Sequence, residues 1–334
     1  MKKKTIILIG AAILVLALLL GGLPLVSQLV FHRSLAATML TWQFRRDRYT
    51  TAEAFEEYLD EKRAGNAASY VIPEDAALTV PVVRDTYGEM DYFVLNGPGG
   101  PDGRIILYFP GGSYIDQPTR SHWEFMNALA EDTGSVIYVP LYPKLPDRDA
   151  ASAYAVLTDW YASLLRGTVH GEVLFMGDSA GGGMALSLAM QLRDTGLGGP
   201  DRLILLSPWA DVTMTNTAIP GYGKRDPALD AEMLRQLGIL WAGGLDTTDP
   251  VVSPLYGDLT GLGEIIFFTT DGELLYPDLV QLADELEAAG AAYRMYPRSD
   301  LFHCWPLYAY LNIPESEEDY ARIVSIINEG QETP

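Results

Sequence analysis

The sequence predicts an α/β protein built on a largely parallel β-sheet. Between residues 104 and 328, short apolar runs alternate with longer segments of helical periodicity, and this alternation predicts parallel strands covered by helices on both faces. One apolar run ends in Gly-Asp-Ser-Ala-Gly at residues 177–181 and passes directly into a helical pattern, which predicts a strand, a sharp turn and a helix. The chain has 334 residues and 32 glycines, and 48% of its residues are apolar. It is therefore long enough for one large domain with many tight turns.

The predicted elements follow in order along the chain. Residues 80–84 and 90–95 alternate between apolar and polar side chains and are separated by Asp-Thr-Tyr-Gly, which is typical of a β-hairpin. Further strands are expected over residues 104–109, 135–139, 173–176, 202–206, 264–269 and 292–296. Helices are expected over residues 119–131, 150–165, 184–192, 274–289 and 317–328. The stretch 210–261 interrupts this alternation, and we expect an insertion above the carboxyl edge of the sheet, where ligands bind.

Composition excludes several classes of function. The formal net charge of −21 would repel a phosphate backbone, so no nucleic-acid partner is expected. Cys304 is the single cysteine, which rules out an intramolecular disulfide. The sequence contains no cysteine–histidine cluster typical of zinc and no Gly-x-x-x-x-Gly-Lys-[Ser/Thr] loop typical of nucleotides. We therefore expect neither a metal nor another cofactor.

Residues 1–33 are expected to anchor the protein in a membrane. Three lysines at positions 2–4 precede the uncharged, mostly apolar run 5–23, and a helix over that run would span about 28 Å, close to the thickness of the hydrocarbon core. The alternative is a signal peptide that is cleaved, which would leave a secreted protein. The lysines predict a single pass with the rest of the chain on the extracytoplasmic side, although three arginines among residues 45–48 reduce the charge asymmetry.

Ser179, at the centre of the Gly-Asp-Ser-Ala-Gly segment, is the expected nucleophile. The turn that carries such a serine is strained, and side chains two residues before and after it would collide with neighbouring backbone. The helix that follows directs its N-terminal amides and the positive end of its dipole at the hydroxyl. The alternative is a glycine-rich turn that only joins a strand to a helix.

His303 is the expected general base. A serine hydroxyl is a poor nucleophile unless a base takes its proton, and histidine suits neutral pH. Of the four histidines, His32 lies at the membrane boundary, His122 begins a helix and His170 precedes the strand of the serine. Only His303 follows the serine, just after a strand, which agrees with the order Ser, acid, His of α/β-hydrolases. The alternative is a structural histidine.

The acid that orients the histidine should follow the strand 264–269, at the same edge of the sheet. Asp271 is the first acidic residue past this strand and is the predicted acid. Glu273 is the second choice, and Asp278 is expected on the surface of a helix. The alternative for each of these carboxylates is a helix cap or a solvated side chain.

Backbone amides are expected to bind the oxyanion that forms during acyl transfer. One donor is Ala180, the residue after the nucleophile, and others should come from the loop after the strand 104–109. That loop reads Pro-Gly-Gly-Ser at residues 110–113. Small residues allow close approach of the backbone, so Gly112 and Ser113 are the predicted donors, with Gly111 as a further possibility.

These motifs resemble the hormone-sensitive-lipase-like esterases of the α/β-hydrolase superfamily. The resemblance covers about residues 104–307 and includes Phe-Pro-Gly-Gly-Ser-Tyr, Gly-Asp-Ser-Ala-Gly-Gly, Leu-Ser-Pro-Trp-Ala-Asp-Val-Thr and Phe-His-Cys-Trp-Pro-Leu. It implies an α/β-hydrolase fold over residues 71–334 and a helical cap, formed by residues 34–70 with a contribution from 210–261. It maps nucleophile, acid and base onto Ser179, Asp271 and His303, without a cofactor. An amphipathic connector near the membrane is the alternative for 34–70.

The chain departs from this family at two segments. The His-Gly-Gly-Gly of the family is Pro-Gly-Gly-Ser here, beginning at Pro110, which raises a question about the geometry of the loop. The segment Tyr-Pro-Lys-Leu-Pro-Asp at 142–147 only loosely matches the Tyr-Arg-Leu-Ala-Pro-Glu of the family. Asp178, beside the nucleophile, is interpreted as structural.

The predicted function is that of a serine carboxylesterase or lipase-like hydrolase acting on small-molecule esters. The resemblance implies short to medium acyl chains and an acyl-enzyme intermediate. One alternative is an extracytoplasmic acyltransferase or deacylase that acts on a cell-envelope acceptor. The other is a surface binding module whose chemistry is vestigial, for which the altered Pro-Gly-Gly-Ser loop is the only support.

Overall fold

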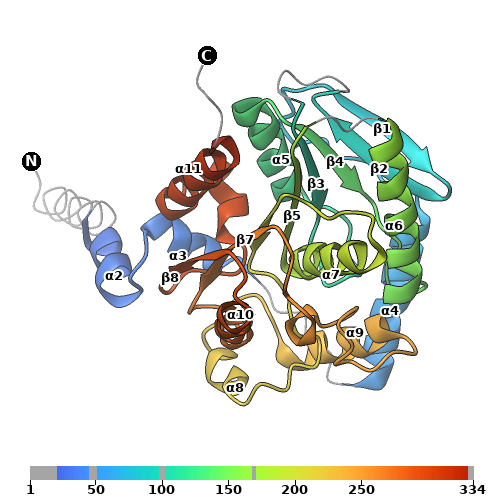
Figure 1. Ribbon diagram of the computed structural model, residues 1–334. Helices are drawn as coiled ribbons and strands as arrows, with labels where there is room; N and C mark the ends of the chain where they lie inside the picture. The colour runs from blue at the N-terminus through green and yellow to red at the C-terminus, as the bar shows by residue number, and fades with distance from the viewer. Residues whose placement is uncertain (1–20, 45–50, 98–102, 168–170, 330–334) are drawn as a thin grey trace, which may run out of the picture.

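A computed structural model describes residues 21–44, 51–97, 103–167 and 171–329 (Figure 1). Within these residues, one eight-stranded sheet has the strand order β1-β2-β4-β3-β5-β6-β7-β8. β1 (Val82–Tyr87) pairs antiparallel with β2 (Met90–Leu95), and β2 pairs antiparallel with β4, whereas all the other neighbouring strands are parallel. The predicted parallel sheet with a hairpin at one side is confirmed.

The remaining strands lie close to their predicted positions. They are β3 (Ile105–Phe109), β4 (Val136–Pro140), β5 (Val173–Asp178), β6 (Arg202–Leu206), β7 (Glu264–Thr270) and β8 (Tyr293–Arg298). The main helices are α5 (Arg120–Thr133), α6 (Ala150–Gly167), α7 (Ser179–Thr195), α10 (Tyr276–Ala288) and α11 (Pro314–Asn328). α11 begins earlier than predicted, because Pro314 occupies the first helical position, where proline is favoured.

The hydrophobic core has two layers, one on each face of the sheet. Successive side chains of a strand point to opposite faces, so Val173 and Phe175 of β5 belong to one apolar cluster and Leu174 and Met176 to the other. α6, α7 and α10 pack in the first layer, while α5 and α11 pack in the second (Figure 1). The central strands are therefore buried on both faces, as the continuous apolar runs predict.

The insertion at 210–261 lies over the carboxyl edge of the sheet. It contains α8 (Ile219–Tyr222), α9 (Ala231–Ala242) and the short 3-10 helix η2 (Pro254–Tyr256). The ring of Trp241 in α9 stacks on that of Tyr114, in the loop after β3, at 4.2 Å between centroids. The insertion thus packs directly on the loop that was expected to bind the oxyanion. A second 3-10 helix, η3 (Trp305–Leu311), follows the predicted base.

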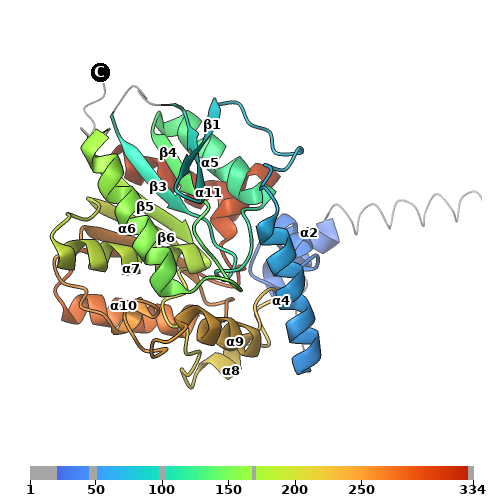
Figure 2. The same cartoon turned by 90° about the vertical axis from the view of Figure 1, so that its right-hand side faces the viewer.

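Among the described residues, three helices precede the sheet: α2 (Leu23–Val30), α3 (Leu35–Thr41) and α4 (Ala52–Ala67). Figure 2 shows α2 and α4 on one side of the molecule, beyond α9. In the four described stretches, no helix has both the length and the apolar character needed to cross a membrane. The run 5–23, for which an anchor is expected, lies outside the described residues except for its last three positions.

Candidate active site

The turn between β5 and α7 holds Ser179 in a left-handed backbone conformation. Its φ is +51°, a region that residues other than glycine rarely adopt and that is common at functional sites. A Cβ on Gly177 would come within 2.5 Å of the carbonyl oxygen of Gly181, and a Cβ on Gly181 would collide with the carbonyl of Phe109. Only glycine therefore fits on either side of the serine, which is the physical reason for the motif.

The N-terminus of α7 begins at the serine itself. Because α7 starts at Ser179, the N–H of Ala180 lies in the first turn, where helix geometry provides no intrahelical acceptor. The positive end of the helix dipole lies at the same place. Ser179 is buried at 8% exposure. An amide donor is thus adjacent to a hydroxyl that is largely shielded from solvent.

Asp178 is a buried acceptor that ties three elements together. Its Oδ1 accepts hydrogen bonds from the Tyr108 hydroxyl at 2.7 Å and from the Gly111 N–H at 3.1 Å. Its Oδ2 lies 3.1 Å from Nε2 of His122 in α5. Nδ1 of His122 accepts the N–H of Thr119 at 2.9 Å, so Nε2 carries the proton and donates it to Asp178. Burial raises the pKa of Asp178, but the neighbouring imidazole and the hydrogen bonds outweigh burial and lower the pKa overall.

The loop after β3 leaves two of its predicted amides available for an anion. The N–H of Gly111 is donated to Asp178, so the expectation that Gly111 is a further oxyanion donor is wrong. The N–H groups of Gly112 and Ser113 donate no hydrogen bond within the described residues. Gly112 has a φ of +119° and Ser113 a φ of +52°, so the backbone reverses direction at these two residues.

His303 is paired with a carboxylate through one ring nitrogen only. Its Nδ1 lies 2.7 Å from Oε2 of Glu273. Because a carboxylate accepts, Nδ1 carries a proton, and Nε2 keeps its lone pair while the imidazole is neutral. Nε2 is buried and has no hydrogen-bond partner within the described residues. Of the other histidines, His32 contacts Asp300, and His170 lies outside the described residues.

Asp271, the predicted acid, does not reach the imidazole. Its Oδ1 accepts the N–H of Asp300 at 2.7 Å. Between it and Glu273 lies Gly272, which packs so closely on Leu301 that a Cβ would collide with the carbonyl of Leu301. The two acids consequently reach different parts of the same loop: Asp271 reaches its beginning and Glu273 reaches the histidine. The prediction of Asp271 as the partner of the base is wrong, and the second choice occupies that place.

Glu273 is held rigidly in the interior. It is fully buried, at 0% exposure. Its Oε1 accepts hydrogen bonds from the Thr269 hydroxyl at 2.9 Å and from the Thr270 N–H at 3.3 Å, which leaves Oε2 for His303. The hydrogen bonds from the end of β7 therefore fix the direction in which the carboxylate faces the imidazole.

Neighbouring strands bring the serine and the histidine to the same edge. Asp178, which precedes the serine, is paired in register with Leu206 at the end of β6. Cys304, which follows the histidine, donates its thiol to the Leu206 carbonyl at 3.4 Å and its N–H to Ser207 at 3.2 Å. His303 thus lies over the end of β6, between the strand that leads to Ser179 and the strand that leads to Glu273.

The surroundings of His303 favour the protonated form of its imidazole. Burial by itself lowers the pKa of His303, but interactions with Cys304 and with Glu273 outweigh burial and raise the pKa well above its ordinary value. Burial raises the pKa of the Cys304 thiol to about 11. The described residues include no group of His, Cys, Asp and Glu side chains suited to a metal ion.

Two further acidic residues are buried, although the sequence gives no indication of their burial. Asp278 was expected on the surface of a helix but is 1% exposed, and burial together with the nearby Asp211 raises its pKa to about 7. The surface expectation is wrong, because the first turn of α10 faces the insertion. Asp226, within that insertion, accepts the N–H of Leu274 at 2.7 Å, and burial raises its pKa.

Comparison with known proteins agrees with the fold. A family model described as the alpha/beta hydrolase fold matches residues 106–307. The acetyl-hydrolase of Streptomyces hygroscopicus is 31% identical over 218 residues, which are 63% of this chain and 71% of that protein. Two relatives from Mycobacterium tuberculosis share a region that is only 59% and 44% of their own length.

Solved structures agree with the family model. An esterase from the bacterial hormone-sensitive lipase family has a TM-score of 0.73 and 25% identity, and the match covers 88% of this chain and 96% of that one. A candidate esterase from Staphylococcus aureus has a TM-score of 0.82 at 24% identity over 89% of this chain and 100% of its own, a likeness of fold. The chain therefore belongs to the α/β-hydrolase fold family, and its resemblance to the hormone-sensitive-lipase-like esterases is confirmed.

Proposed function

We propose that this protein is a serine carboxylesterase that hydrolyses small-molecule esters through an acyl-enzyme. Family membership and the relatives named as esterases and acetyl-hydrolases support an ester-hydrolysing enzyme. The observation that carries the finer proposal is the 2.7 Å pairing of His303 Nδ1 with Glu273. It leaves Nε2 of His303 unpartnered, at the sheet edge where the turn presents Ser179.

Each step assigns a proton to a named atom. Nε2 of His303 takes the proton of Ser179 as Oγ attacks the ester carbonyl carbon, and Glu273 stabilises the imidazolium that forms. The N–H groups of Gly112, Ser113 and Ala180 bind the oxyanion.

The tetrahedral intermediate then collapses, and the alcohol leaves with the proton returned by Nε2. Water attacks the acyl-enzyme in the same way, so that the carboxylic acid is released and the Ser179 hydroxyl is restored.

The proposed substrates are esters of short to medium acyl chains. The acetyl-hydrolase relative supports the short end of this range. The stacked rings of Tyr114, Trp209 and Trp241 fill space beside the oxyanion loop, since Tyr114 lies 5.4 Å from Trp209 and 4.2 Å from Trp241 between centroids. Kinetics on p-nitrophenyl esters from acetate to palmitate test the range, and a kcat/KM that peaks at palmitate would contradict it.

The proposed location is a membrane, with residues 1–33 as a single-pass anchor and the catalytic domain on the extracytoplasmic side. The lysines at positions 2–4 and the uncharged run that follows support this. Leu25, Leu29 and Val30 of α2 are 55%, 67% and 61% exposed, so apolar surface continues past the end of that run. Protease added to intact cells should digest the catalytic domain; complete protection of that domain until the cells are lysed would refute the orientation.

The decisive experiment uses the full-length chain and a fluorophosphonate probe. Wild type should hydrolyse p-nitrophenyl acetate or butyrate and should be labelled at Ser179. Ser179→Ala should lose both properties, while Ser113→Ala should keep labelling because its backbone amide remains. A folded wild-type protein without hydrolysis and without labelling would overturn the proposal.

A further inference from the structure

Lys144 lies in the segment 142–147, outside the catalytic residues, and it is a buried cation. It is 8% exposed, although lysine is almost never buried without a partner. Its Nζ donates a hydrogen bond to the backbone carbonyl of Asp116 at 3.1 Å and lies 4.4 Å from the centre of the Tyr142 ring. The bond to Asp116 reaches the far end of the oxyanion loop.

The turn that ends at Asp116 sets the direction of an oxyanion donor. The carbonyl of Gly112 accepts the N–H of Asp116 at 2.8 Å and the N–H of Ile115 at 2.9 Å. The peptide bond that joins Gly112 to Ser113 is trans, so its C=O and N–H point in opposite directions. While Asp116 holds the Gly112 carbonyl, the N–H of Ser113 must point away from the turn.

The same loop is strained and must be held from outside. Ser113 and Tyr114 have φ values of +52° and +60°, which cost free energy for residues with a side chain. Tyr142 donates its hydroxyl to the Pro110 carbonyl at 2.7 Å, and the Leu145 N–H donates to the Tyr114 carbonyl at 2.9 Å. The segment 142–145 therefore contacts the loop at its start, its middle and, through Lys144, its end.

We propose that Lys144 is a positioning residue that fixes the Ser113 amide in the oxyanion hole by holding the carbonyl of Asp116. The proposal rests on the esterase function argued above. Lys144 touches neither the serine nor the histidine, and its effect is exerted through the peptide plane between Gly112 and Ser113. Loss of the bond would let the turn relax, which weakens binding of the transition state more than binding of the ester.

The charge on Lys144 gives this role a pH signature. Burial lowers the pKa of Lys144 to about 7, although Asp116 opposes that shift. Below this pH the ammonium makes a charge-assisted hydrogen bond, and above it the neutral amine makes a weaker one. Two sets of charged groups surround the Lys144 ammonium. The first is the Asp116 carboxylate, which is paired with Lys62 of α4 at 2.5 Å. The second lines the adjacent cavity of about 820 Å³ and consists of Glu89, Asp147, Arg148 and Asp159.

The test compares three full-length variants with wild type on p-nitrophenyl acetate. Lys144→Met keeps the volume and removes the donor, so kcat should fall about tenfold with KM changed less than about twofold. Lys144→Arg keeps a hydrogen-bond donor, and the adjacent cavity has room for the longer side chain, so kcat should stay within about threefold of wild type. Lys62→Met is the matched control, because it removes an ammonium from the Asp116 carboxylate rather than from its carbonyl, and it should change kcat less than about twofold.

The pH dependence separates positioning from packing. The kcat of Lys144→Met divided by that of wild type should rise toward one between pH 6 and 9, because wild type itself loses the ammonium in that range. Dividing the two rates cancels the titration of His303. If Lys144→Met does not fold, the ratio of Lys144→Arg to wild type must rise over the same range, since arginine stays charged.

Three outcomes overturn the inference and leave the esterase function intact. They are a Lys144→Met enzyme within twofold of wild type, equal losses in Lys144→Met and Lys62→Met, and a ratio that does not change with pH. A wild-type protein that neither hydrolyses esters nor labels at Ser179 overturns the proposed function, and the inference with it.

Discussion

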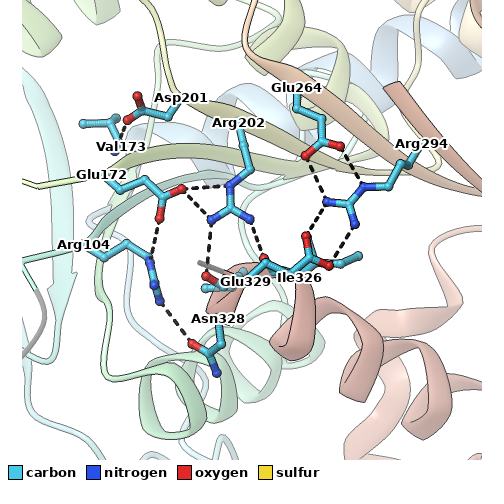
Figure 3. Close-up of polar contacts among 11 residues, drawn as sticks. Arg104, Glu172, Val173, Asp201, Arg202, Glu264, Arg294, Ile326, Asn328 and Glu329 are labelled. Carbon is cyan, nitrogen blue, oxygen red and sulfur yellow. Dashed lines mark hydrogen bonds and ion pairs between the residues drawn. The ribbon is translucent and has the colours of Figure 1, made fainter. Parts of the chain in front are cut away.

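At the amino-terminal edge of the sheet, arginines are paired with carboxylates from neighbouring strands and loops (Figure 3). Glu172, just before β5, accepts from Arg104 at 3.0 Å and from Arg202 at 2.8 Å. Arg202 also donates to the last carbonyls of α11, at Ile326 and Ile327. These bonds join the starts of three parallel strands to the C-terminus of a helix, where a cation is favourable.

The carboxyl-terminal edge has a different construction. Several residues here have a side chain and yet a positive φ: Ser113, Tyr114, Ser179, Ser207, Asp300 and Cys304. Each lies in a loop that follows a strand or in the turn that carries Ser179. Such conformations persist only where the surrounding structure enforces them.

The contrast separates residues that stabilise the strands from residues that position the candidate active site. Ion pairs at the amino edge fix the positions of the strand starts. Because the strands are rigid and buried, their ends at the other edge are fixed as well. The strained turns at the carboxyl edge then place amides and side chains where regular structure would not. Substitutions at the amino edge should therefore change stability without changing kcat, and substitutions at the carboxyl edge should do the reverse.

The largest expected effect is at Ser179, the proposed nucleophile. Ser179→Ala should lower kcat/KM for p-nitrophenyl acetate at least about 10⁴-fold, because no other side chain in the turn can attack. The midpoint of urea unfolding should stay near that of wild type, since the change removes one oxygen atom. Residual turnover within a hundredfold of wild type would mean that the chemistry lies elsewhere.

The next effect distinguishes the two acids after β7. Glu273→Gln should lower kcat about 10³-fold, because the amide cannot stabilise the imidazolium. Asp271→Asn is the matched control and should lower kcat less than about tenfold, since its carboxylate holds the N–H of Asp300 rather than the imidazole. Equal losses, or a greater loss in Asp271→Asn, would contradict the assignment of Glu273.

Substitutions at the amino edge should change the free energy of unfolding but not kcat. Arg202→Met removes one of the two cations paired with Glu172, and it leaves two carbonyls of α11 without their donor. This variant should lower the free energy of unfolding by about 2 kcal/mol, which is less than the loss expected for a fully buried ion pair. Urea denaturation measures this. Arg235→Met, on an exposed pair with Glu232 in α9, should change it by less than about 0.5 kcal/mol. A fall in kcat of the folded Arg202→Met protein would break the contrast between the edges.

The smallest effect is a shift of the acid limb of the pH–rate profile. Since Glu273 contributes to the raised pKa of His303, the imidazole of wild type becomes protonated, and activity is lost, as pH falls through a value above the ordinary one for histidine. In Glu273→Gln this limb should move to lower pH, because the carboxylate no longer favours the imidazolium. The residual kcat/KM of the variant, followed from pH 5 to 9, measures the shift, and an unchanged limb would contradict it.

The sequence by itself determined the sheet and the turn, and it predicted Ser179 and His303, which the structure brings to the same edge of the sheet. The period of the apolar runs is a local property, and so is the need for glycine on both sides of Ser179. His303 followed from elimination among four histidines and from chain order. These inferences need no knowledge of which loops touch.

Only the tertiary structure shows which acidic residue contacts His303 and which residues hold the loops in place. Asp271 and Glu273 are two residues apart in the same segment, and the structure shows that Glu273 contacts the imidazole while Asp271 contacts the N–H of Asp300. The burial of Asp278, the pairing of His122 with Asp178 and the bond from Lys144 to Asp116 all join segments distant in sequence. Direction and burial depend on packing between such segments, which no local pattern encodes.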